Sequence, residues 1–363
     1  MATTKSKVLE TVKPGQYDMK SVITGPAPIA LAGTNPLYIA DQHGLIMKYY
    51  SDTGKTEKFT DLSPVMIKLK SDYEERGLLD MILTQDETRM FVYYTNKFNV
   101  NELCEINMKT QVATVLLRMD HEASVHNGGK IAIDMYGYLY LSTGDGGPQK
   151  DPNNRAQDLN TLSGKILRID VSKPGKYTIP GNNPFVNLKD VRHEIYAYGL
   201  RNPWGLSFDG RHGRGFVTDA GFNDREEVNA LIKGANYGWN IKEGTKFTDF
   251  GQRSNKPMVF TDPLYEYETG KFPALKLTRK PSVIIGGFPL NDDTYLFADI
   301  SGIIMRIDMK GNLVRINDIS TLHENTKYIK TFCRDNNGNI YIITSDSMGP
   351  DGKGAIYSLK ILN

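Results

Sequence analysis

The stretch that shows the fold most clearly is SVHNGGKIAIDMYGYLYLSTGDGGPQKDPNNRAQDLNTLSGKILRID, residues 124–170. Its first apolar strand lies between two polar turns, HNGG (126–129) and GDGG (144–147), and a second strand, KILRID, ends it. Val, Ile and Tyr favour extended strands, whereas Gly and Asp turns tolerate positive φ angles and close backbone approach. His126 and Asp145 are therefore expected on the connecting loops of a sheet, where functional residues concentrate. Taken alone, each of them would be interpreted as a residue that only shapes its turn.

The same pattern of an apolar strand, a tight turn and a second strand recurs six times along the chain. The units are residues 36–50, 89–108, 138–170, 215–231, 294–309 and 339–361. Six units in 363 residues give about 60 residues each, near the length of a propeller blade with its loops. Small sheets of this kind bury both faces by stacking radially. We predict an all-β, six-bladed β-propeller rather than a β-sandwich, with one domain over 21–363 and a loose or blade-closing segment over 1–20.

The composition limits the classes of function. A net charge of +2 argues against a nucleic-acid partner, and the chain contains no apolar run long enough for a membrane span. The first twenty residues lack the apolar core of a secretory signal, so we expect a cytoplasmic location or another route without a recognisable signal peptide. Two cysteines, Cys104 and Cys333, exclude a disulfide framework and a cysteine zinc site. Their pairing and the oligomeric state stay open.

Five motifs, in order and spacing, match a known family. They are ERGLL (75–79), HNGGKIAI (126–133), YLYLSTGDGG with AQDLNTLSGKILRID (138–170), EIYAYGLRNPWGLSFD (194–209) and DAGFNDREEVNALIKGANYGW (219–239). Together they resemble the glucose/sorbosone dehydrogenase family of six-bladed propellers, from about residue 25 to the C-terminus. That family contains soluble sugar dehydrogenases that use pyrroloquinoline quinone (PQQ) and calcium, and Hedgehog-interacting-protein-like members.

The resemblance implies a catalytic site in the central third of the chain. His126 would be the base that removes a hydroxyl proton as hydride passes from the substrate to the quinone, a role that suits a side chain titrating near neutral pH. Asp145 would orient that base. Arg201 and Asn202 would hold oxygens of the cofactor, and the Arg201 cation would stabilise the charge that develops on the carbonyl accepting hydride. The competing interpretation of Arg201 is a structural salt bridge in its loop.

The acidic stretch 219–227 suits a hard cation, because calcium prefers carboxylate and carbonyl oxygens. The resemblance implies that the carbonyls of Gly221 and Phe222 bind a cofactor-linked calcium, and that Glu227 and the Tyr237 carbonyl help to bind a second, structural calcium. Phe222 replaces a proline of the family, but the ligand there is main chain. The alternative is an acidic turn that is simply solvated.

The departures from the family pattern fall on the cofactor pocket. Val125 replaces an Asp that precedes the base, and Glu75, which we keep in the cofactor-binding set, replaces a Gln. In the last two blades, Ser301 stands at the position of a lysine that clamps the cofactor carboxylates, while Tyr328 and Lys330 replace two arginines. Lys330 remains the candidate cofactor-binding cation there. Lys and Arg are not equivalent where carboxylates are gripped in pairs, and losing cations weakens the binding of a trianion.

Three functions stay open. The first is a PQQ- and calcium-dependent dehydrogenase of a sugar or other polyol. The second is a catalytically degenerate propeller that acts as a calcium-stabilised binding or interaction protein, and the third is a calcium-dependent lactonase or hydrolase. A flat slot with at least two cations would favour quinone chemistry, whereas clustered Asp, Asn and Glu ligands would favour hydrolysis. Trp204 and Trp239 are interpreted as packing residues.

Overall fold

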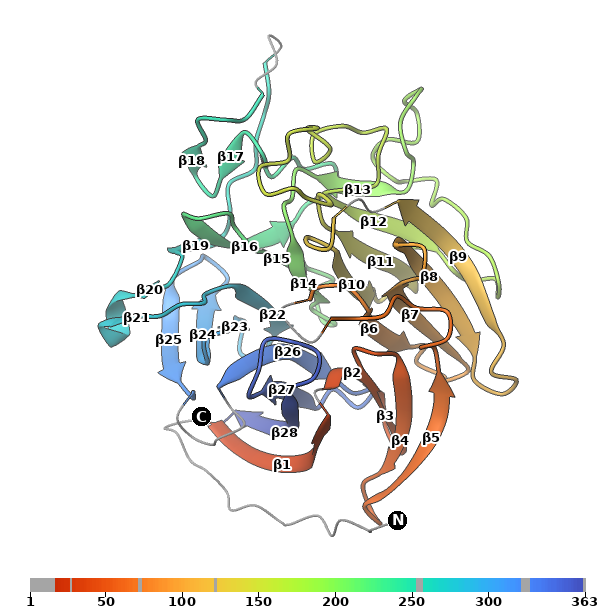
Figure 1. Ribbon diagram of the computed structural model, residues 1–363. Coiled ribbons are helices and arrows are strands. Elements are labelled where there is room, and N and C mark those ends of the chain that lie inside the picture. The colour runs from red at the N-terminus through yellow and green to blue at the C-terminus, as the bar shows by residue number, and fades with distance from the viewer. Residues whose placement is uncertain are drawn as a thin grey trace.

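The computed structural model describes residues 17–26, 28–70, 74–120, 123–252, 257–320 and 327–361. Six four-stranded antiparallel sheets are arranged around a central axis, with one edge of each sheet facing that axis (Figure 1). This confirms the predicted all-β six-bladed propeller. Within the described ranges, no helix is long and apolar enough to cross a membrane.

In each blade the strands run in order from the innermost, at the axis, to the outermost. The first blade is β2 (Pro28–Gly33), β3 (Leu37–Asp41), β4 (Leu45–Tyr50) and β5 (Lys55–Asp61), and the second is β6 (Leu78–Leu83), β7 (Arg89–Thr95), β8 (Val100–Asn107) and β9 (Ala113–Asp120). The third is β10 (Gly128–Ile133), β11 (Tyr138–Thr143), β12 (Lys165–Asp170) and β13 (Ile195–Tyr198), and the fourth is β14 (Pro203–Phe208), β15 (Gly215–Asp219), β16 (Arg225–Leu231) and β19 (Tyr265–Glu268). The fifth is β22 (Ile284–Pro289), β23 (Thr294–Asp299), β24 (Ile303–Asp308) and β25 (Leu313–Asp318), and the sixth is β26 (Tyr328–Arg334), β27 (Ile340–Ser345), β28 (Lys353–Ile361) and β1 (Tyr17–Pro26). Two small hairpins, β17 (Lys242–Glu243) with β18 (Lys246–Phe247) and β20 (Lys271–Phe272) with β21 (Leu277–Thr278), and the 3-10 turn η1 (Pro273–Leu275) lie outside the blades.

The six repeat units seen in the sequence are the second and third strands of the six blades. In the fifth blade, for example, β23 and β24 pair with Phe297 opposite Met305, and both residues are buried. These middle strands are covered on both faces by neighbouring blades, so they are the most apolar and give the clearest repeat.

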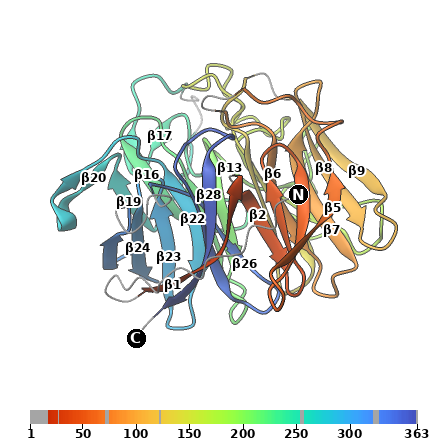
Figure 2. The ribbon, with the colours of Figure 1, turned by 60° about the horizontal axis from the view of Figure 1, so that its bottom comes forward.

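The sixth blade is completed by the start of the chain. β1 pairs antiparallel with β28, from Tyr17 opposite Ile361 to Pro26 opposite Lys353, so the N-terminal strand is the outer strand of the C-terminal blade (Figure 2). Met19 is buried against the core of that blade. The predicted boundary after residue 20 falls within β1, and residues 1–16 lie outside the described part of the chain.

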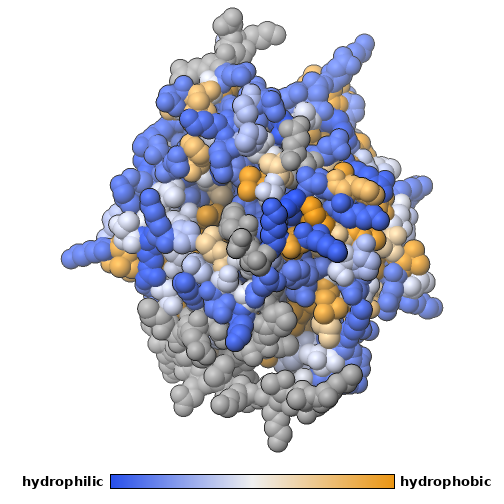
Figure 3. Space-filling view, in the orientation of Figure 1, coloured by the Kyte–Doolittle hydropathy of each residue, from blue (hydrophilic) through white to orange (hydrophobic). Residues whose placement is uncertain are grey.

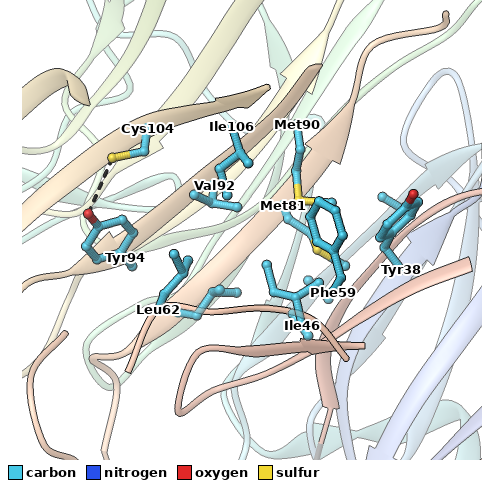
Figure 4. Packing of buried hydrophobic residues seen from close by; sticks show 14 of the residues in the cluster. Tyr38, Ile46, Phe59, Leu62, Met81, Met90, Val92, Tyr94, Cys104 and Ile106 are labelled. Atoms are coloured by element: carbon cyan, nitrogen blue, oxygen red, sulfur yellow. Dashed lines mark hydrogen bonds between the residues drawn. The ribbon is translucent and has the colours of Figure 1, made fainter. Parts of the chain in front are cut away.

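The core is a ring of hydrophobic clusters between neighbouring blades. Figure 4 shows the cluster of the first two blades, where the Tyr94 hydroxyl lies 3.3 Å from the Cys104 sulfur. Cys104 and Cys333 are both buried and free. The surface in Figure 3 is mostly hydrophilic, with hydrophobic residues scattered between polar ones.

The blade topology gives the propeller two distinct ends. The upper end carries the connections from each outer strand to the next inner strand, such as 123–127 and 199–202, and the loops between second and third strands, such as 144–164 and 220–224. The lower end carries the turns between first and second strands, such as 134–137 and 335–339. The predicted site residues in loops, His126, Asp145, Arg201, Asn202, Gly221 and Phe222, lie at the upper end.

Candidate functional site

His126 lies at the upper end, directly before β10, in a conformation that the glycines around it make possible. Its φ is 59°, in the left-handed region, and its carbonyl lies against the backbone of the GDGG turn. A Cβ at Gly144 would come within 1.9 Å of the His126 carbonyl oxygen. Between these two turns the sequence predicted one strand, whereas the structure has the hairpin of β10 and β11. The hairpin brings the two turns together, and the glycine at 144 is required for their contact.

A hydrogen-bonded chain joins Asp145, His126 and Arg201. His126 Nδ1 lies 2.7 Å from Asp145 Oδ1, and His126 Nε2 lies 2.8 Å from Arg201 Nη2. A guanidinium only donates hydrogen bonds, so Nε2 must accept here, and the ring proton sits on Nδ1 and is donated to Asp145. This is the neutral tautomer in which Nε2 carries a lone pair. All three side chains are buried.

Arg201 also bridges to the loop where a metal was expected. Its Nη1 donates to the carbonyls of Ala220 (3.1 Å) and Gly221 (2.7 Å), and its Nη2 donates to Gln149 Oε1. Its Nε is buried without a hydrogen-bond partner. The guanidinium therefore connects His126 to the carbonyl of Gly221, a predicted calcium ligand. Its hydrogen-bond partners in the described residues are carbonyl oxygens and an imidazole, not the carboxylate that a structural salt bridge would require.

Side-chain oxygens that accept hydrogen bonds from main-chain amides hold these loops together. Asp219, the last residue of β15, accepts hydrogen bonds from the amides of Arg201 (2.8 Å) and Asn202 (2.7 Å). Asn202 Oδ1 accepts from the Gly128 amide, and Glu75 accepts from the His126 amide at 2.6 Å. The structure thus brings Glu75 and Asn202 beside His126, where both support the backbone of the site.

Trp239 contributes more than the packing role expected from the sequence. Its Nε1 donates to Asp145 Oδ2 at 2.7 Å, while Asp145 Oδ1 holds His126. The indole ring also lies 5.5 Å from the Arg201 guanidinium and edge-on to Phe250. The sequence did not predict this hydrogen bond, because a tryptophan in NYGW can equally well pack its ring or donate its N–H. Only the fold brings Trp239 next to Asp145.

Two buried carboxylates face each other across β15 and β16. Asp219 is opposite Glu227 in the strand register. Burial raises the pKa of Glu227 to about 8 and that of Asp219 to about 7, and the proximity of the two carboxyls adds to the shift at Glu227. Asn229, two residues along the same strand, donates to Glu227 while its Oδ1 is buried without a partner. An oxygen cluster of this composition matches the preference of calcium, and Asn229 was not among the predicted ligands although strand alternation places it on the face of Glu227.

The other predicted metal residues are distributed around this cluster. The Gly221 carbonyl accepts from Arg201, and the Phe222 ring lies over Arg201 and edge-on to Phe250. The Tyr237 hydroxyl bonds to the Ala230 carbonyl. One oxygen of Glu243 accepts the four successive amides of Phe222, Asn223, Asp224 and Arg225. The 221–225 loop is therefore organised by a buried carboxylate, which the sequence motif did not reveal.

In the expected carboxylate clamp of the last blades, the predicted cation is engaged by the main chain. Lys330 is half-buried on β26 and donates to the Met348 carbonyl at 2.6 Å, and burial lowers its pKa to about 8. Ser301 donates to Asp299. No described hydrogen bond joins Lys330 to the His126 network, so the structure gives this predicted cofactor residue a local main-chain partner.

A further group with metal-ligand chemistry lies at the lower end. Asp209, His212 and Asp293 offer ligand atoms within 4.8 Å of one another. However, Asp209 accepts from Arg214 and His212, and Asp293 accepts from Arg211 and Arg214. The arginines already neutralise these carboxylates, so we interpret the group as a salt-bridge network.

Residues 25–356 match the family described as Glucose / Sorbosone dehydrogenase. The chain is 37% identical over 201 residues to the HIPL2 protein of Arabidopsis thaliana, covering 49% of this chain and 28% of that protein. It is 29% identical over 177 residues to the aldose sugar dehydrogenase YliI of Escherichia coli, covering 45% of this chain and 46% of that protein. The chain spans less than half the length of these curated relatives.

The fold is also that of solved sugar dehydrogenase structures. The PQQ-bound aldose sugar dehydrogenase of Streptomyces coelicolor superposes with a TM-score of 0.72 at 22% identity, covering 96% of this chain and all of that one. An oxidoreductase from Thermus thermophilus described as a putative glucose dehydrogenase gives a TM-score of 0.73 at 23% identity, covering 95% of this chain and all of that one. At these identities the likeness shows a common fold.

Proposed function

Because the chain belongs to the glucose/sorbosone dehydrogenase family, we propose that it is a PQQ- and calcium-dependent dehydrogenase of a sugar or other polyol. The observation that carries this proposal is the chain Asp145–His126–Arg201, which leaves His126 Nε2 as an acceptor inside a buried site. The names of relatives that are sugar dehydrogenases give the substrate class.

The protein's own residues would handle the proton. His126 Nε2 takes the proton of the reacting hydroxyl, and Asp145 stabilises the imidazolium that forms, with Trp239 holding the second oxygen of Asp145. PQQ, when bound, supplies the quinone carbonyl that accepts the hydride. Since Arg201 occupies Nε2 in this structure, its guanidinium must move to the oxygens of the ligand before the hydroxyl can reach the base.

The residues around His126 fit an oxygen-rich cofactor. Arg201 Nε and Asn127 Nδ2 are both buried donors without a partner. A buried donor without an acceptor is costly, so these two atoms are suited to the oxygens of a bound ligand. Arg201 would hold such oxygens, and the cluster of Glu227, Asp219 and Asn229 Oδ1 would hold calcium, whose charge replaces the protons that burial favours on the two carboxyls.

The test is a titration of metal-stripped protein with PQQ, with and without calcium, followed by a sugar panel with an artificial electron acceptor. We expect calcium-dependent binding and sugar-driven reduction. His126→Asn should lower turnover at least about 100-fold while PQQ still binds, because the general base is lost. His212→Asn is the matched control, since His212 also pairs with a carboxylate but lies at the lower end.

A second candidate, a calcium-stabilised binding propeller, is favoured by two observations. Arg201 closes the site by bonding both His126 and Gly221, and the expected clamp retains only Lys330, which is engaged by Met348. Absence of PQQ binding at micromolar cofactor, with calcium still raising the melting temperature, would select this candidate. Full turnover by His126→Asn would contradict the proposed mechanism.

A further inference from the structure

The axis of the propeller encloses a cavity of about 660 Å³ that is separate from the His126 site. All six inner strands, β2, β6, β10, β14, β22 and β26, contribute to its wall, and these strands surround the centre in Figure 1. The lining continues into the lower turns at Asp134–Gly137 and Asp335–Gly338, where Met135 is 56% exposed. His126, Asp145, Arg201 and Asn202 are not part of the lining. The cavity thus opens at the lower end.

A buried polar cluster lies across the cavity on three different blades. Lys130 Nζ lies 3.1 Å from Thr331 Oγ1 and 3.5 Å from Asp80 Oδ1, and all three residues are buried. Lys130 is four positions after His126 along the chain, toward the lower end. Lys130 and Asp80 have opposite charges and form an ion pair. The pair lies on β10 and β6, between the lower part of the cavity and the His126 site.

The carboxylates at the rim are occupied by their own turns. Asp134 accepts the amides of Tyr136 and Tyr138 and the hydroxyl of Tyr140. Asp335 accepts the amides of Asn337 and Asn339, the Asn339 side chain and the Tyr341 hydroxyl. These hydrogen bonds hold both carboxylates in their own turns.

Arg334 is a lining cation whose guanidinium makes no direct ion pair within the described residues, although the charges of Asp209 and Asp335 act on it at longer range. Its guanidinium lies 4.4 Å from the Phe288 ring centroid, and its Nη2 donates to the Pro289 carbonyl, while Nε is buried without a partner. Among the described residues, no carboxylate forms an ion pair with it. The third lining cation, Arg89, is bound by Glu105 and the Val171 carbonyl. Much of the remaining wall is apolar, including Leu31, Ile131, Leu206, Phe288 and Phe332.

We propose that this cavity binds a small organic carboxylate, with the carboxylate at Arg334 and an apolar body against the aliphatic and aromatic wall. A guanidinium held over an aromatic ring and by a carbonyl is restricted in position, which favours binding of a carboxylate, and a cavity of this size and mixed lining is typical of small-molecule sites. The site is independent of the proposed dehydrogenase activity, because it uses none of the same side chains.

The test uses octanoate as the probe, measured by titration calorimetry on the full chain below the concentration at which octanoate forms micelles. Wild-type protein should bind octanoate saturably at one site, and octanol, which lacks the charge, at least ten-fold more weakly. Arg334→Gln should weaken octanoate binding at least ten-fold. Arg211→Gln, at the lower end but outside the lining, and His126→Asn should stay within two-fold of wild type.

Tryptophan fluorescence provides a measurement that does not depend on the folding of the Arg334 variant. Trp204 lines the cavity, whereas Trp239 lies in the His126 site. Octanoate should change the emission of wild-type protein and of Trp239→Phe, but not that of Trp204→Phe. The proposal is overturned if octanoate and octanol bind equally, if Arg334→Gln binds as wild type does, or if no saturable binding occurs. Loss of sugar turnover with octanoate binding intact would contradict only the proposed function.

Discussion

At the scale of single residues, the arrangement at His126 depends on which atom each neighbour offers. Asp145 uses one oxygen for His126 and the other for Trp239, so the carboxylate is fixed in its plane from both sides. The presence of His126, Asp145 and Arg201 in one place could be inferred from their motifs. The tautomer and the Trp239 bond could not, because they depend on side-chain directions that spacing along the chain does not contain.

Trp239 is therefore a positioning residue, and Trp239→Phe tests that role. Phenylalanine keeps an aromatic ring against Phe250 and Arg201 but removes the N–H that Asp145 accepts. A hydrogen bond to a charged group is worth about 1.5–3 kcal/mol, so we expect kcat to fall about 10- to 100-fold. KM should change less than two-fold, because Trp239 acts through Asp145 and not on the substrate.

The measurement is steady-state kinetics with sugar and an artificial acceptor, beside a melting curve for each variant. Trp204→Phe is the control, since Trp204 lines the lower cavity and not the His126 site. Equal kcat values for the two tryptophan variants would show that the N–H of Trp239 has no part in positioning Asp145.

At the scale of elements, strands β15 and β16 provide the oxygen cluster. Pairing of Asp219 with Glu227 follows from a register that the sequence alone does not state, and the same register places Asn229 beside them. The composition of the acidic stretch 219–227 was enough to predict a metal site there. The sequence could not predict which carboxyls of this region are buried in the cluster, such as Glu227, and which support the loop, such as Glu243. Their burial depends on the hairpin around Glu243 and on the neighbouring blade.

Calcium should stabilise the protein through this cluster, and Glu227→Gln should remove that effect. Ligand at about 100 times its Kd adds about 2.7 kcal/mol of unfolding free energy, which corresponds to a rise in Tm of about 3–4 °C for a domain of this size. In chelator, the Gln variant should melt close to wild type, because burial already favours the uncharged form of Glu227. Differential scanning calorimetry with calcium and with chelator measures both quantities.

Glu226→Gln is the matched control for this experiment. Glu226 is also a buried carboxyl whose pKa burial raises to about 8, but it accepts from the amides of Ile284 and Gly221 and from Thr269 rather than from Asn229. It should keep the calcium response. A calcium-dependent rise in Tm that survives in Glu227→Gln would place the metal elsewhere.

At the scale of the whole molecule, the ring is closed by one sheet made from the two ends of the chain. The blade count was predictable because the middle strands of every blade are apolar and repeat. The closing strand was harder to delimit: β1 begins at Tyr17, and its sequence, YDMKSVITGP, has no repeat partner next to it in the chain. Its place beside β28 is a contact between opposite ends of the sequence, which local patterns do not encode.

Met19 tests how much this closure contributes to stability. Its side chain is 3% exposed and packs in the cluster that contains Leu359 and Tyr357 of β28. Met19→Ala should lower the free energy of unfolding by about 2–4 kcal/mol, because a buried side chain is lost and a cavity remains. Met135→Ala, in which the same residue type is 56% exposed at a lower turn, should change it by less than about 0.5 kcal/mol. Urea unfolding followed by circular dichroism gives the free energy of unfolding of each variant, provided that the m-values are equal. A loss below about 0.5 kcal/mol in both variants would mean that packing of β1 on β28 contributes little to the stability of the ring. The expected difference would show that the N-terminal strand stabilises the closed propeller.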